Sequence, residues 1–499
     1  MDSSRAKLTP RIRLAADAGN CLVRSTAEQR RTIDRILYRR YPHAEWGTFF
    51  RFGYRETRWG LLVCFVDFQP PGAGDFDQRS PLVEFSPGYI SRALRALDGC
   101  EFGVGFIHSH PEGCAPSPSL ADDDMDGYFA AEFEKFSGGR PYASLIASRD
   151  GCGQRSFLGR CFHRGKWMPV FEWLTCGRDV LRRERDFRAA FTPAVHPESD
   201  ERARQLLGDG AGNRLRNAVV GIVGCSGLGT PVAHILARSG IGEFVLVDVG
   251  HFKASNHERN HASRASDLTA TALTKVELLR RLIHEIRPET RVTSITADVL
   301  DDRAVDELSR CDVILGCTDS FYARAALGDF ATHYAVPVLD LAVQMGARDG
   351  LLTEQVGEIA RYLPGLPCPW CRNRVTAAGI RAETATDAER SQAERAAAAA
   401  FERGEDGAQY WTGQRRQELT VGYMTSAVAA MGAGYAHNWL TGAATMPHDR
   451  FQFDLGLQSL GVVADTKQPQ PDCSCQRCIG FADQGRADFT VSMPVRAAA

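Results

Sequence analysis

Residues 219–229 read Val-Val-Gly-Ile-Val-Gly-Cys-Ser-Gly-Leu-Gly, an apolar strand pattern that runs into a glycine-rich turn. A helix pattern follows to about Arg238, and the next strand pattern covers residues 244–247. Glycines at such a turn let backbone amides approach phosphate groups at the N-terminus of the helix. Alternating strands and helices favour a mostly parallel sheet, so we expect a Rossmann-like, doubly wound α/β fold that binds a nucleotide.

The composition of the chain limits its class. The chain has 499 residues, which exceeds the usual size of one domain, so we expect two or three domains. The net charge is −2 and no block of five or six like charges occurs, so we expect no nucleic-acid partner. No apolar signal segment opens the sequence, and fifteen cysteines without such a signal indicate the reduced thiols of a cytoplasmic protein. The apolar stretch 420–440 contains glycine, serine, histidine and asparagine, which favours a buried helix over a membrane span.

The first third of the chain has a different pattern, in which strands outnumber helices. Helices are expected at 26–41, with Thr26 as a candidate cap, and at 86–97. The strand patterns occupy residues 47–54, 60–68, 102–108, 142–148 and 156–162.

These patterns divide the chain into two domains of the α/β class. The expected boundaries are a flexible tail at 1–21, an N-terminal domain at 22–175, a linker at 176–199, a C-terminal domain at 200–485 and a tail at 486–499. We expect the charged segment 381–416 to be an inserted surface helix.

A histidine pair, His108 and His110, ends a predicted strand of the N-terminal domain. Residues i and i+2 of a strand point to the same face, so both side chains reach one metal ion. Asp122, at the start of a predicted helix, is the candidate third ligand. Three protein ligands leave a fourth position for water, which is typical of a catalytic zinc site.

Two further residues complete this candidate site. Glu45 is the candidate acceptor of the water proton, with Glu84 as the nearest rival, and Ser119 is the candidate hydrogen-bond donor to a developing oxyanion. Ser119 and Asp122 also match the Ser-x-x-Asp pattern of a helix N-cap, which needs no metal. The two interpretations are compatible, because a cap would fix both side chains.

The stretch His108-Ser-His-Pro, followed by Ser119-Leu-Ala-Asp122 and preceded by Glu45, resembles the JAB/MPN family of JAMM metalloproteases over about residues 22–175. The resemblance implies the JAB/MPN α/β fold, with zinc held by the two histidines and the aspartate. It implies Glu45 as general base and Ser119 as oxyanion support. It also implies cleavage of peptide or isopeptide bonds after the C-terminus of ubiquitin or its relatives.

Charged residues after the glycine-rich turn narrow the choice of nucleotide. Asp248 ends the next strand, about twenty residues on, where a carboxylate commonly binds ribose hydroxyls. The turn alone also fits an ordinary Rossmann dehydrogenase. Arg259 and Lys275 favour ATP, because cations bind its phosphates and stabilise the departing pyrophosphate, and Asp319 is a candidate magnesium ligand.

This ordered set resembles the ThiF/MoeB superfamily over about residues 200–480, the adenylation fold shared with ubiquitin-activating enzymes. The resemblance implies that Arg259 and Lys275 are catalytic. The implied nucleotide and magnesium contacts are Gly224, Gly227, Gly229, Asp248, Asn256, Arg259, Lys275 and Asp319. It further implies a homodimer in which an arginine of the partner subunit enters the ATP site, with Arg202 or Arg204 as candidates.

Two Cys-x-x-Cys pairs, Cys368–Cys371 and Cys475–Cys478, lie about a hundred residues apart. Four thiolates form a tetrahedral structural zinc site, and members of the superfamily often carry one. Cys473 is an alternative ligand, because it crowds the second pair. A redox role for one pair is the other interpretation.

The sequence departs from the activating enzymes at their thioester position. Those enzymes normally carry a nucleophilic cysteine between the first zinc pair and the late helix, whereas residues 372–472 contain no cysteine. We therefore expect either an enzyme that stops at the acyl-adenylate or an acceptor elsewhere, such as a hydroxyl at Thr420. A threonine before a helix more commonly caps it. Cys225, inside the glycine-rich turn, is expected as a packing residue.

Together the two motif sets predict a bifunctional enzyme for a ubiquitin-like protein. Zinc-dependent cleavage after its C-terminal glycine exposes the carboxylate that ATP- and magnesium-dependent adenylation consumes. By analogy, bacterial systems that resemble ubiquitination use both domain types, and some of these systems defend against phage. A separate conjugating enzyme is then an expected partner. One alternative is sulfur-carrier activation for cofactor or cysteine synthesis. Another is a non-catalytic adaptor that binds a ubiquitin-like tail.

Overall fold

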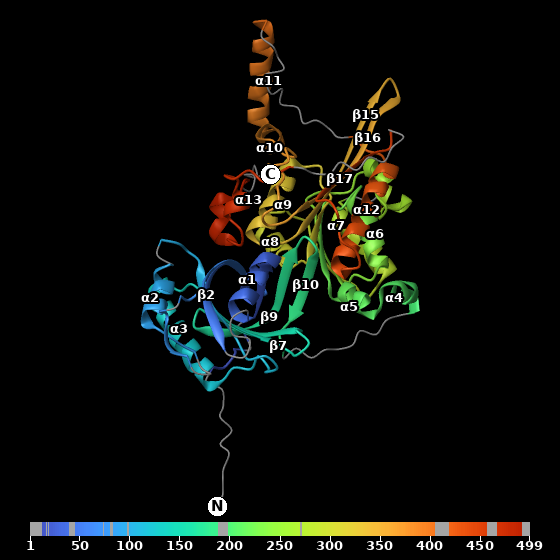
Figure 1. Cartoon of the computed structure of the whole chain (residues 1–499). Coiled ribbons are helices and arrows are strands. Elements are labelled where there is room, and N and C mark those ends of the chain that lie inside the picture. Colours follow the sequence, from blue (N-terminus) through green and yellow to red (C-terminus); the bar gives the residue numbers. More distant parts are fainter. Residues whose placement is uncertain are drawn as a thin grey trace, which may run out of the picture.

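The computed structural model describes residues 12–15, 17, 19–38, 45–72, 74–79, 83–96, 99–187, 198–269, 272–404, 419–456 and 467–491. Within them the chain forms two parts that lie against each other, an N-terminal barrel and a C-terminal sheet covered by helices (Figure 1).

The N-terminal part is a closed barrel. Its strands are β1 (Asn20–Thr26), β2 (Trp46–Thr57), β3 (Gly60–Gln69), β6 (Gly103–Ser109), β7 (Tyr142–Arg149), β8 (Arg155–His163), β9 (Lys166–Gly177) and β10 (Val180–Arg185). They follow the order β1-β3-β2-β6-β7-β8-β9-β10, and β1 also pairs in parallel with β9, which closes the ring. The remaining elements are α1 (Ala27–Tyr38), α2 (Pro87–Arg95), α3 (Leu120–Ser137) and the two-stranded β4 (Phe76–Arg79) and β5 (Val83–Phe85).

Local signals place the first helix, and tertiary pairing extends the barrel past its expected end. The Thr26 hydroxyl accepts a hydrogen bond from the Gln29 amide at 3.1 Å, and the Gln29 side chain accepts one from the Thr26 amide at 2.8 Å, which confirms the expected cap. Residues 180–185, expected within the linker, instead form β10 against β9. The charged sequence of β10 hid a strand whose arginines pair with acidic groups of neighbouring elements.

The C-terminal part confirms the expected doubly wound sheet. Its strand order is β13-β12-β11-β14-β15-β16-β17, in which β11 to β15 are parallel and β16 and β17 are antiparallel. The strands are β11 (Val219–Val223), β12 (Glu243–Val247), β13 (Arg291–Ile295), β14 (Val313–Gly316), β15 (Val338–Arg348), β16 (Leu351–Tyr362) and β17 (Arg450–Asp454). The helices are α4 (Glu201–Leu207), α5 (Asp209–Asn217), α6 (Gly229–Arg238), α7 (Lys275–Ile286), α8 (Asp302–Leu308), α9 (Phe321–His333), α10 (Ala377–Thr384), α11 (Asp387–Glu402), α12 (Gly422–Thr441) and α13 (Ser474–Arg477).

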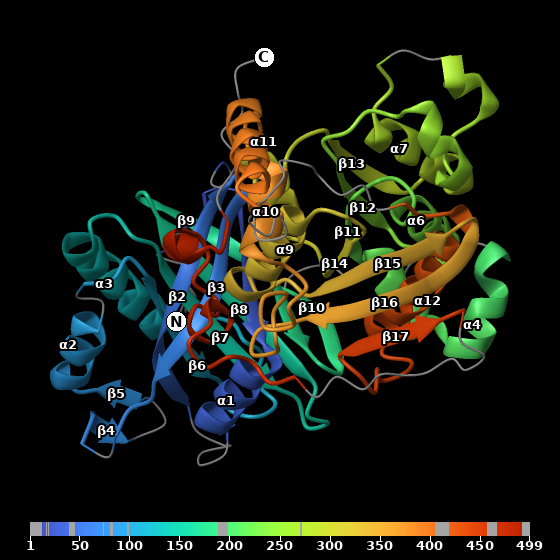
Figure 2. The ribbon, with the colours of Figure 1, turned by 90° about the horizontal axis from the view of Figure 1, so that it is seen from above.

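Two apolar clusters cover the two faces of this sheet. Side chains of α6, α7 and α12 pack on one face, while α8 and α9 pack on the other together with strands of the barrel (Figure 2). Helix α12 confirms the expected buried helix in the apolar stretch. In the described part of the chain, no helix combines the length and apolar character that a membrane span requires.

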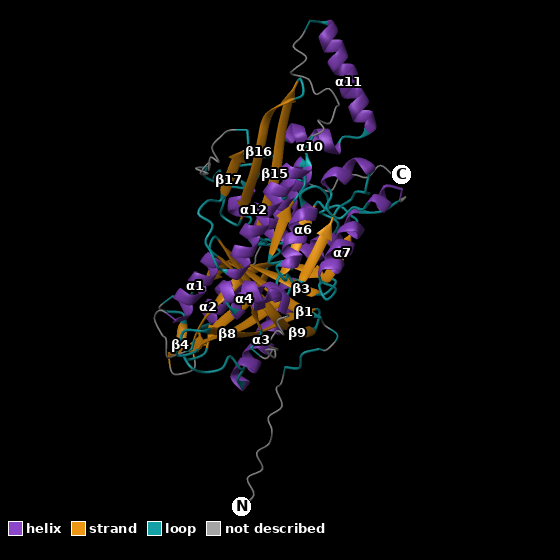
Figure 3. Cartoon of the chain, turned by 90° about the vertical axis from the view of Figure 1, so that its right-hand side faces the viewer, coloured by secondary structure: helices purple, strands orange, loops and turns teal. Residues whose placement is uncertain are grey.

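The expected insertion forms two helices, α10 and α11. Helix α11 projects from the body at the end of the molecule opposite the barrel, the end toward which the long β15–β16 hairpin also extends (Figure 3). Residues 405–416, the remainder of the expected insertion, lie outside the described residues.

Candidate functional site

The histidine pair and its acidic neighbours come together at one end of β2 and β6. In the antiparallel register Trp46 pairs with Ser109 and Gly47 with His108, so Glu45 comes next, beside His110. The Ser109 hydroxyl accepts a hydrogen bond from the Trp46 amide at 3.2 Å and donates one to the Trp46 carbonyl at 3.3 Å. Ser109, the residue between the histidines, therefore holds the segment that carries Glu45.

The ligand atoms have the spacing of a metal site. Nitrogen Nε2 of His108 lies 3.1 Å from Oδ1 of Asp122, and Nε2 of His110 lies 3.9 Å from Oδ2. Ligands at zinc bond lengths in a tetrahedron lie about 3.4 Å apart. All three side chains are buried, and both Nε2 atoms are among the buried nitrogens that have no hydrogen-bond partner. Buried polar atoms without partners fit a bound cation.

The tautomer of His110 agrees with this fit. Its Nδ1 lies 2.9 Å from the Ala115 carbonyl oxygen, which only accepts hydrogen bonds. The proton therefore resides on Nδ1 and leaves the Nε2 lone pair facing Asp122, as for metal-binding histidines whose second nitrogen donates to a carbonyl.

Ser119 and Asp122 form the N-cap of α3 and serve the candidate metal site at the same time. The Ser119 hydroxyl accepts from the Asp122 amide at 3.2 Å, and Oδ2 of Asp122 accepts from the Ser119 amide at 2.6 Å. The cap and metal interpretations of the sequence are thus compatible. The hydroxyl keeps its proton for donation, because in the cap it is only an acceptor.

Electrostatics tie Glu45 to the same cluster. Burial raises the pKa of Glu45, and the nearby imidazoles of His108 and His110 partly offset this rise. Burial also opposes ionisation of Asp122, but the adjacent imidazoles of His108 and His110 outweigh it and hold the pKa of Asp122 well below its usual range. Glu45 is thus half-buried within electrostatic reach of the candidate ligands, whereas the side chain of its rival Glu84 lies outside the described ones.

No sequence pattern indicated Arg160, a buried arginine on β8 that supports the first turn of α3. It donates from Nε to Asp126 at 2.7 Å and from Nη2 to the Asp122 carbonyl at 3.2 Å, and it also pairs with Asp123. This guanidinium neutralises two buried carboxylates and fixes the helix turn that presents Asp122. The contact was missed because it joins residues more than thirty positions apart.

The glycine-rich turn has the close contacts that only glycine permits. Gly224 adopts φ +96°, and a Cβ there would lie 2.5 Å from the Cys317 carbonyl oxygen. A Cβ on Gly229 would lie 2.1 Å from the Gly224 carbonyl oxygen, which shows how tightly the turn closes onto α6. Asp248, at the end of β12, accepts from the Cys225 amide at 2.8 Å and from the Gly250 amide at 2.7 Å.

The structure brings the predicted nucleotide residues to one cavity of about 500 Å³ at the carboxyl ends of the parallel strands. That volume is in the range of small-molecule sites, roughly 300–1,000 Å³. Lys275 lies with its Nζ 3.6 Å from Oδ1 of Asp248, and the Arg259 side chain lies over Gly227. The cavity is lined by Gly224, Gly227, Asp248, Asn256, Arg259, Lys275 and Asp319 among others. Gly229 does not line it but closes the turn.

Glu383, from α10 of the insertion, also lines this cavity and was not foreseen. Its carboxylate accepts from the Ser320 hydroxyl at 2.7 Å and from the Phe321 and Tyr322 amides at 3.0 Å each. It therefore caps α9 from a distant segment and anchors the insertion beside Asp319. No local pattern marks such a cap, because Glu383 is about sixty residues from its partners.

Thr420 lines the same cavity, and it does not cap α12. The N-cap residue of α12 is Val421, and no side chain makes a cap hydrogen bond there. The expected packing role of Cys225 agrees with its complete burial, which raises the pKa of its thiol well above the ordinary value. The candidate partner-subunit arginine Arg204 pairs within its own chain, with Asp209 at 2.7 Å and Glu201 at 3.3 Å.

Four cysteines from two distant segments cluster under α9. The Sγ atoms of Cys368 lie 3.7 Å from Cys371 and 3.5 Å from Cys473, and Cys371 lies 3.8 Å from Cys475. The Gln470 amide donates to the Cys371 sulfur at 3.4 Å. This set suits a four-thiolate zinc site and corrects one expected ligand, since Cys473 takes the place expected for Cys478. The one-residue gap of Cys473-Ser-Cys475 is sufficient because the chain turns into α13 there.

Comparison with known proteins assigns the C-terminal part. A model of the ThiF family matches residues 200–475. The chain is 32% identical over 126 residues, 25% of its length, to the adenylyltransferase and sulfurtransferase UBA4 of Kluyveromyces lactis, of which it covers 28%. It is 28% identical over 156 residues, 30% of its length, to the sulfur carrier protein ThiS adenylyltransferase of Escherichia coli, of which it covers 61%. The chain therefore spans less than two thirds of these curated relatives.

Among solved structures, Escherichia coli MccB with ATP is similar at 17% identity and a TM-score of 0.41, covering 56% of this chain and 75% of that one. The family match begins at residue 200, so the resemblance of residues 22–175 to JAB/MPN metalloproteases stays a prediction.

Proposed function

Because the chain belongs to the ThiF family, we propose that it adenylates the C-terminal carboxylate of a sulfur-carrier or other ubiquitin-like protein with ATP and magnesium. One observation carries the proposal, the convergence of the predicted nucleotide residues on a single cavity at the carboxyl ends of the strands. The name of the relative that adenylates ThiS favours a sulfur carrier within this class.

The predicted nucleotide residues have distinct roles in this reaction. Amides of the glycine-rich turn and α6 bind phosphate oxygens, and Asp248 is placed for the ribose hydroxyls. The carboxylate of the carrier attacks the α-phosphorus and pyrophosphate leaves, so Arg259 and Lys275 stabilise negative charge that grows on the leaving group. Asp319, exposed at the cavity rim, is the residue to hold magnesium, which supplies further charge neutralisation when bound.

ATP–pyrophosphate exchange tests the proposal. The full chain is mixed with ATP, magnesium and the small ubiquitin-fold protein encoded nearest to its gene. We expect exchange that depends on the carrier and disappears when the terminal glycine of the carrier is removed. Exchange without any carrier, or none with it, contradicts the proposal. Intact mass then distinguishes a free acyl-adenylate from a covalent adduct on the enzyme.

A second function, zinc-dependent peptide hydrolysis, is favoured by the cluster at the end of β2 and β6. The fit of His108, His110 and Asp122 to a zinc ion, with Glu45 and Ser119 beside them, is the observation behind it. A bound zinc ion supplies Lewis-acid chemistry for hydrolysis. Glu45 accepts a proton from the attacking water, and the Ser119 hydroxyl donates a hydrogen bond to the carbonyl oxygen as it gains charge.

The peptidase proposal has its own test. The ubiquitin-fold protein is extended by a short peptide after its C-terminal glycine and incubated with zinc-loaded protein in the absence of ATP. We expect cleavage directly after that glycine, lost in Glu45→Gln, while zinc content measured by metal analysis stays unchanged. Cleavage that persists in Glu45→Gln contradicts the assigned role.

A further inference from the structure

The barrel and the C-terminal part, called the ThiF part from here on, share one apolar core. Leu22, Leu62 and Leu174, on β1, β3 and β9, belong to the same buried cluster as Leu308 and Tyr334 of the ThiF part. Apolar side chains packed to interior density keep their neighbours in place. The junction is therefore a continuous interior, which excludes a flexible hinge between the described parts.

Arg24 locks this junction. It is 1% exposed, and its guanidinium donates to the carbonyl oxygens of Ser309 at 2.8 Å, Ala335 at 3.0 Å and Cys311. Burial lowers its pKa, and backbone carbonyls satisfy its donors. A buried charge that depends on three fixed carbonyls allows no sliding of one part over the other.

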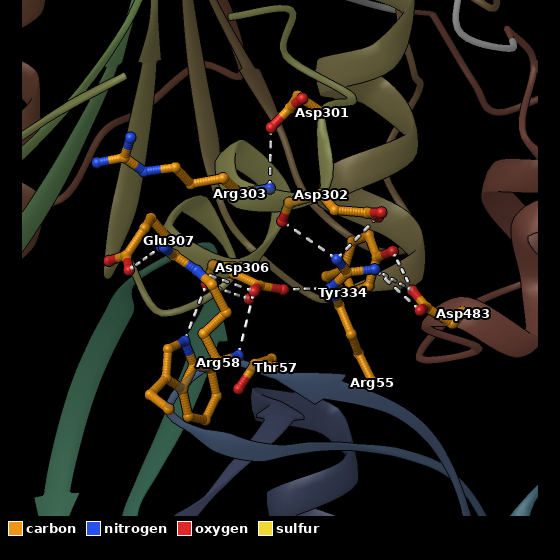
Figure 4. A network of polar contacts seen from close by, with 12 residues as sticks. Arg55, Thr57, Arg58, Asp301, Asp302, Arg303, Asp306, Glu307, Tyr334 and Asp483 are labelled. Carbon is orange, nitrogen blue, oxygen red and sulfur yellow. Dashed lines mark hydrogen bonds and ion pairs between the residues drawn. The ribbon is translucent and has the colours of Figure 1, made fainter. Parts of the chain in front are cut away.

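Arg55, near the end of β2, makes a second lock (Figure 4). It donates to Asp306 at 2.8 Å, to Asp302 at 3.1 Å and to Asp483 at 2.9 Å. The indole nitrogen of Trp59 donates to the Asp306 carbonyl at 3.1 Å. Three acidic groups from two segments of the ThiF part thus enclose one arginine of the barrel.

These contacts meet the parallel sheet at the edge opposite the nucleotide. The carbonyls of Cys311 and Ala335 belong to the turns that enter β14 and β15, whereas the nucleotide cavity is built where β11, β12 and β14 end. Strand β11 has five residues, so about 16 Å of sheet separates the two edges. Figure 1 agrees, because α10, which brings Glu383 to the cavity, lies at the end of the molecule away from the barrel.

The metal cluster is displaced in the other direction. His108 pairs with Gly47 at the start of β2, while Arg55 lies near the far end of that strand. The eight residue steps of β2 from Gly47 to Arg55, about 26 Å of strand, lie between the cluster and this junction contact. The two candidate sites therefore occupy opposite ends of one rigid body.

From this arrangement, and resting on both functions proposed above, we infer that the two sites act in separate binding events. A carrier whose C-terminal extension is cut leaves the metal site, diffuses, and binds again at the nucleotide cavity. Hydrolysis adds water across the peptide bond and yields a carboxylate and an amine. Adenylation then joins that carboxylate to the α-phosphate and releases pyrophosphate. A C-terminus held at one site has no path to the other while its protein stays bound.

Two single-site variants of the full chain test this inference. Glu45→Gln disables the metal site and Lys275→Ala the nucleotide site, and each variant is first shown to keep the other activity. The substrate is the neighbouring ubiquitin-fold protein with a short C-terminal extension that must be removed before adenylation. The two variants are mixed, and pyrophosphate release by the mixture is compared with release by the unaltered protein. The concentration of each working site is the same in both samples.

We expect pyrophosphate release to show the same lag and the same rate in the mixture as in the unaltered protein, so that the ratio of the two rates is near one. When unlabelled mature carrier is added in excess to a labelled precursor, we also expect the labelled fraction of the adenylated carrier to fall. Hand-over within one molecule raises the effective concentration to about millimolar. A faster unaltered protein at micromolar concentrations, or resistance to dilution, overturns the inference. Failure of the unaltered protein to adenylate mature carrier, or to cut the precursor, overturns the corresponding proposed function instead.

Discussion

The metal cluster and the nucleotide cavity differ in how they are assembled. The metal cluster rests on one strand pair and one helix cap, and its three candidate ligands are buried with their ligand atoms within 4.8 Å of one another. The cavity gathers side chains from many segments between residues 223 and 425, and its rim residue Asp319 is exposed. A site built from one strand pair and one helix cap depends strongly on each of its residues. In a site built from many segments, the binding energy is shared among many residues.

The largest effect should come from the general base of the compact site. Glu45→Gln keeps the size of the side chain but removes the proton acceptor, and we expect cleavage to fall about 10²- to 10⁴-fold. Carrier-dependent pyrophosphate exchange should be unchanged. A fall in exchange as well would show that the two sites are not independent.

A smaller loss is expected in the distributed site. Lys275→Ala removes one of two cations beside the phosphates, and we expect exchange to fall about 10²- to 10³-fold. Lys253→Ala is the matched control, because Lys253 is exposed nearby and does not line the cavity. Equal losses in both variants would mean that overall charge, and not the position of Lys275, matters.

Support beneath the metal ligands should matter less than the ligands themselves. Arg160→Lys keeps the charge but loses the fork that holds Asp123, Asp126 and the Asp122 carbonyl, and we expect zinc affinity to fall about 10- to 100-fold. Competition with a chelator measures this affinity without reference to activity. Arg164→Lys, on an exposed arginine of the next turn, should leave the affinity unchanged.

The smallest effect is expected at the anchor of the insertion. Glu383→Gln weakens the capping of α9 by about 1 kcal/mol, which corresponds to a roughly fivefold rise in KM for ATP if the cap shapes the cavity rim. Glu389→Gln changes an exposed carboxylate that caps only α11 and should have no effect on KM. If KM for ATP is the same in both variants, the insertion does not contribute to nucleotide binding.

The sequence predicted what depends on short spacing. The glycine-rich turn, the His-x-His pair, the Ser119–Asp122 cap and the buried helix α12 all follow from periodicity and local chemistry, and the doubly wound sheet is confirmed. Neither β10 nor the roles of Arg160 and Glu383 were foreseen. The charged stretch that contains β10 was interpreted as a linker, while Arg160 and Glu383 bind partners tens of residues away.

The position of Asp483 in the junction has a consequence for protein synthesis. Arg55 emerges from the ribosome long before Asp483, the residue that encloses it from the C-terminal side. Until α8 supplies Asp302 and Asp306, the nascent barrel carries an uncompensated arginine next to uncovered leucines such as Leu22 and Leu62, and Asp483 completes the set of partners only later. We therefore expect the barrel to need protection by chaperones while the ThiF part is translated, because Asp483 follows Arg55 by 428 residues.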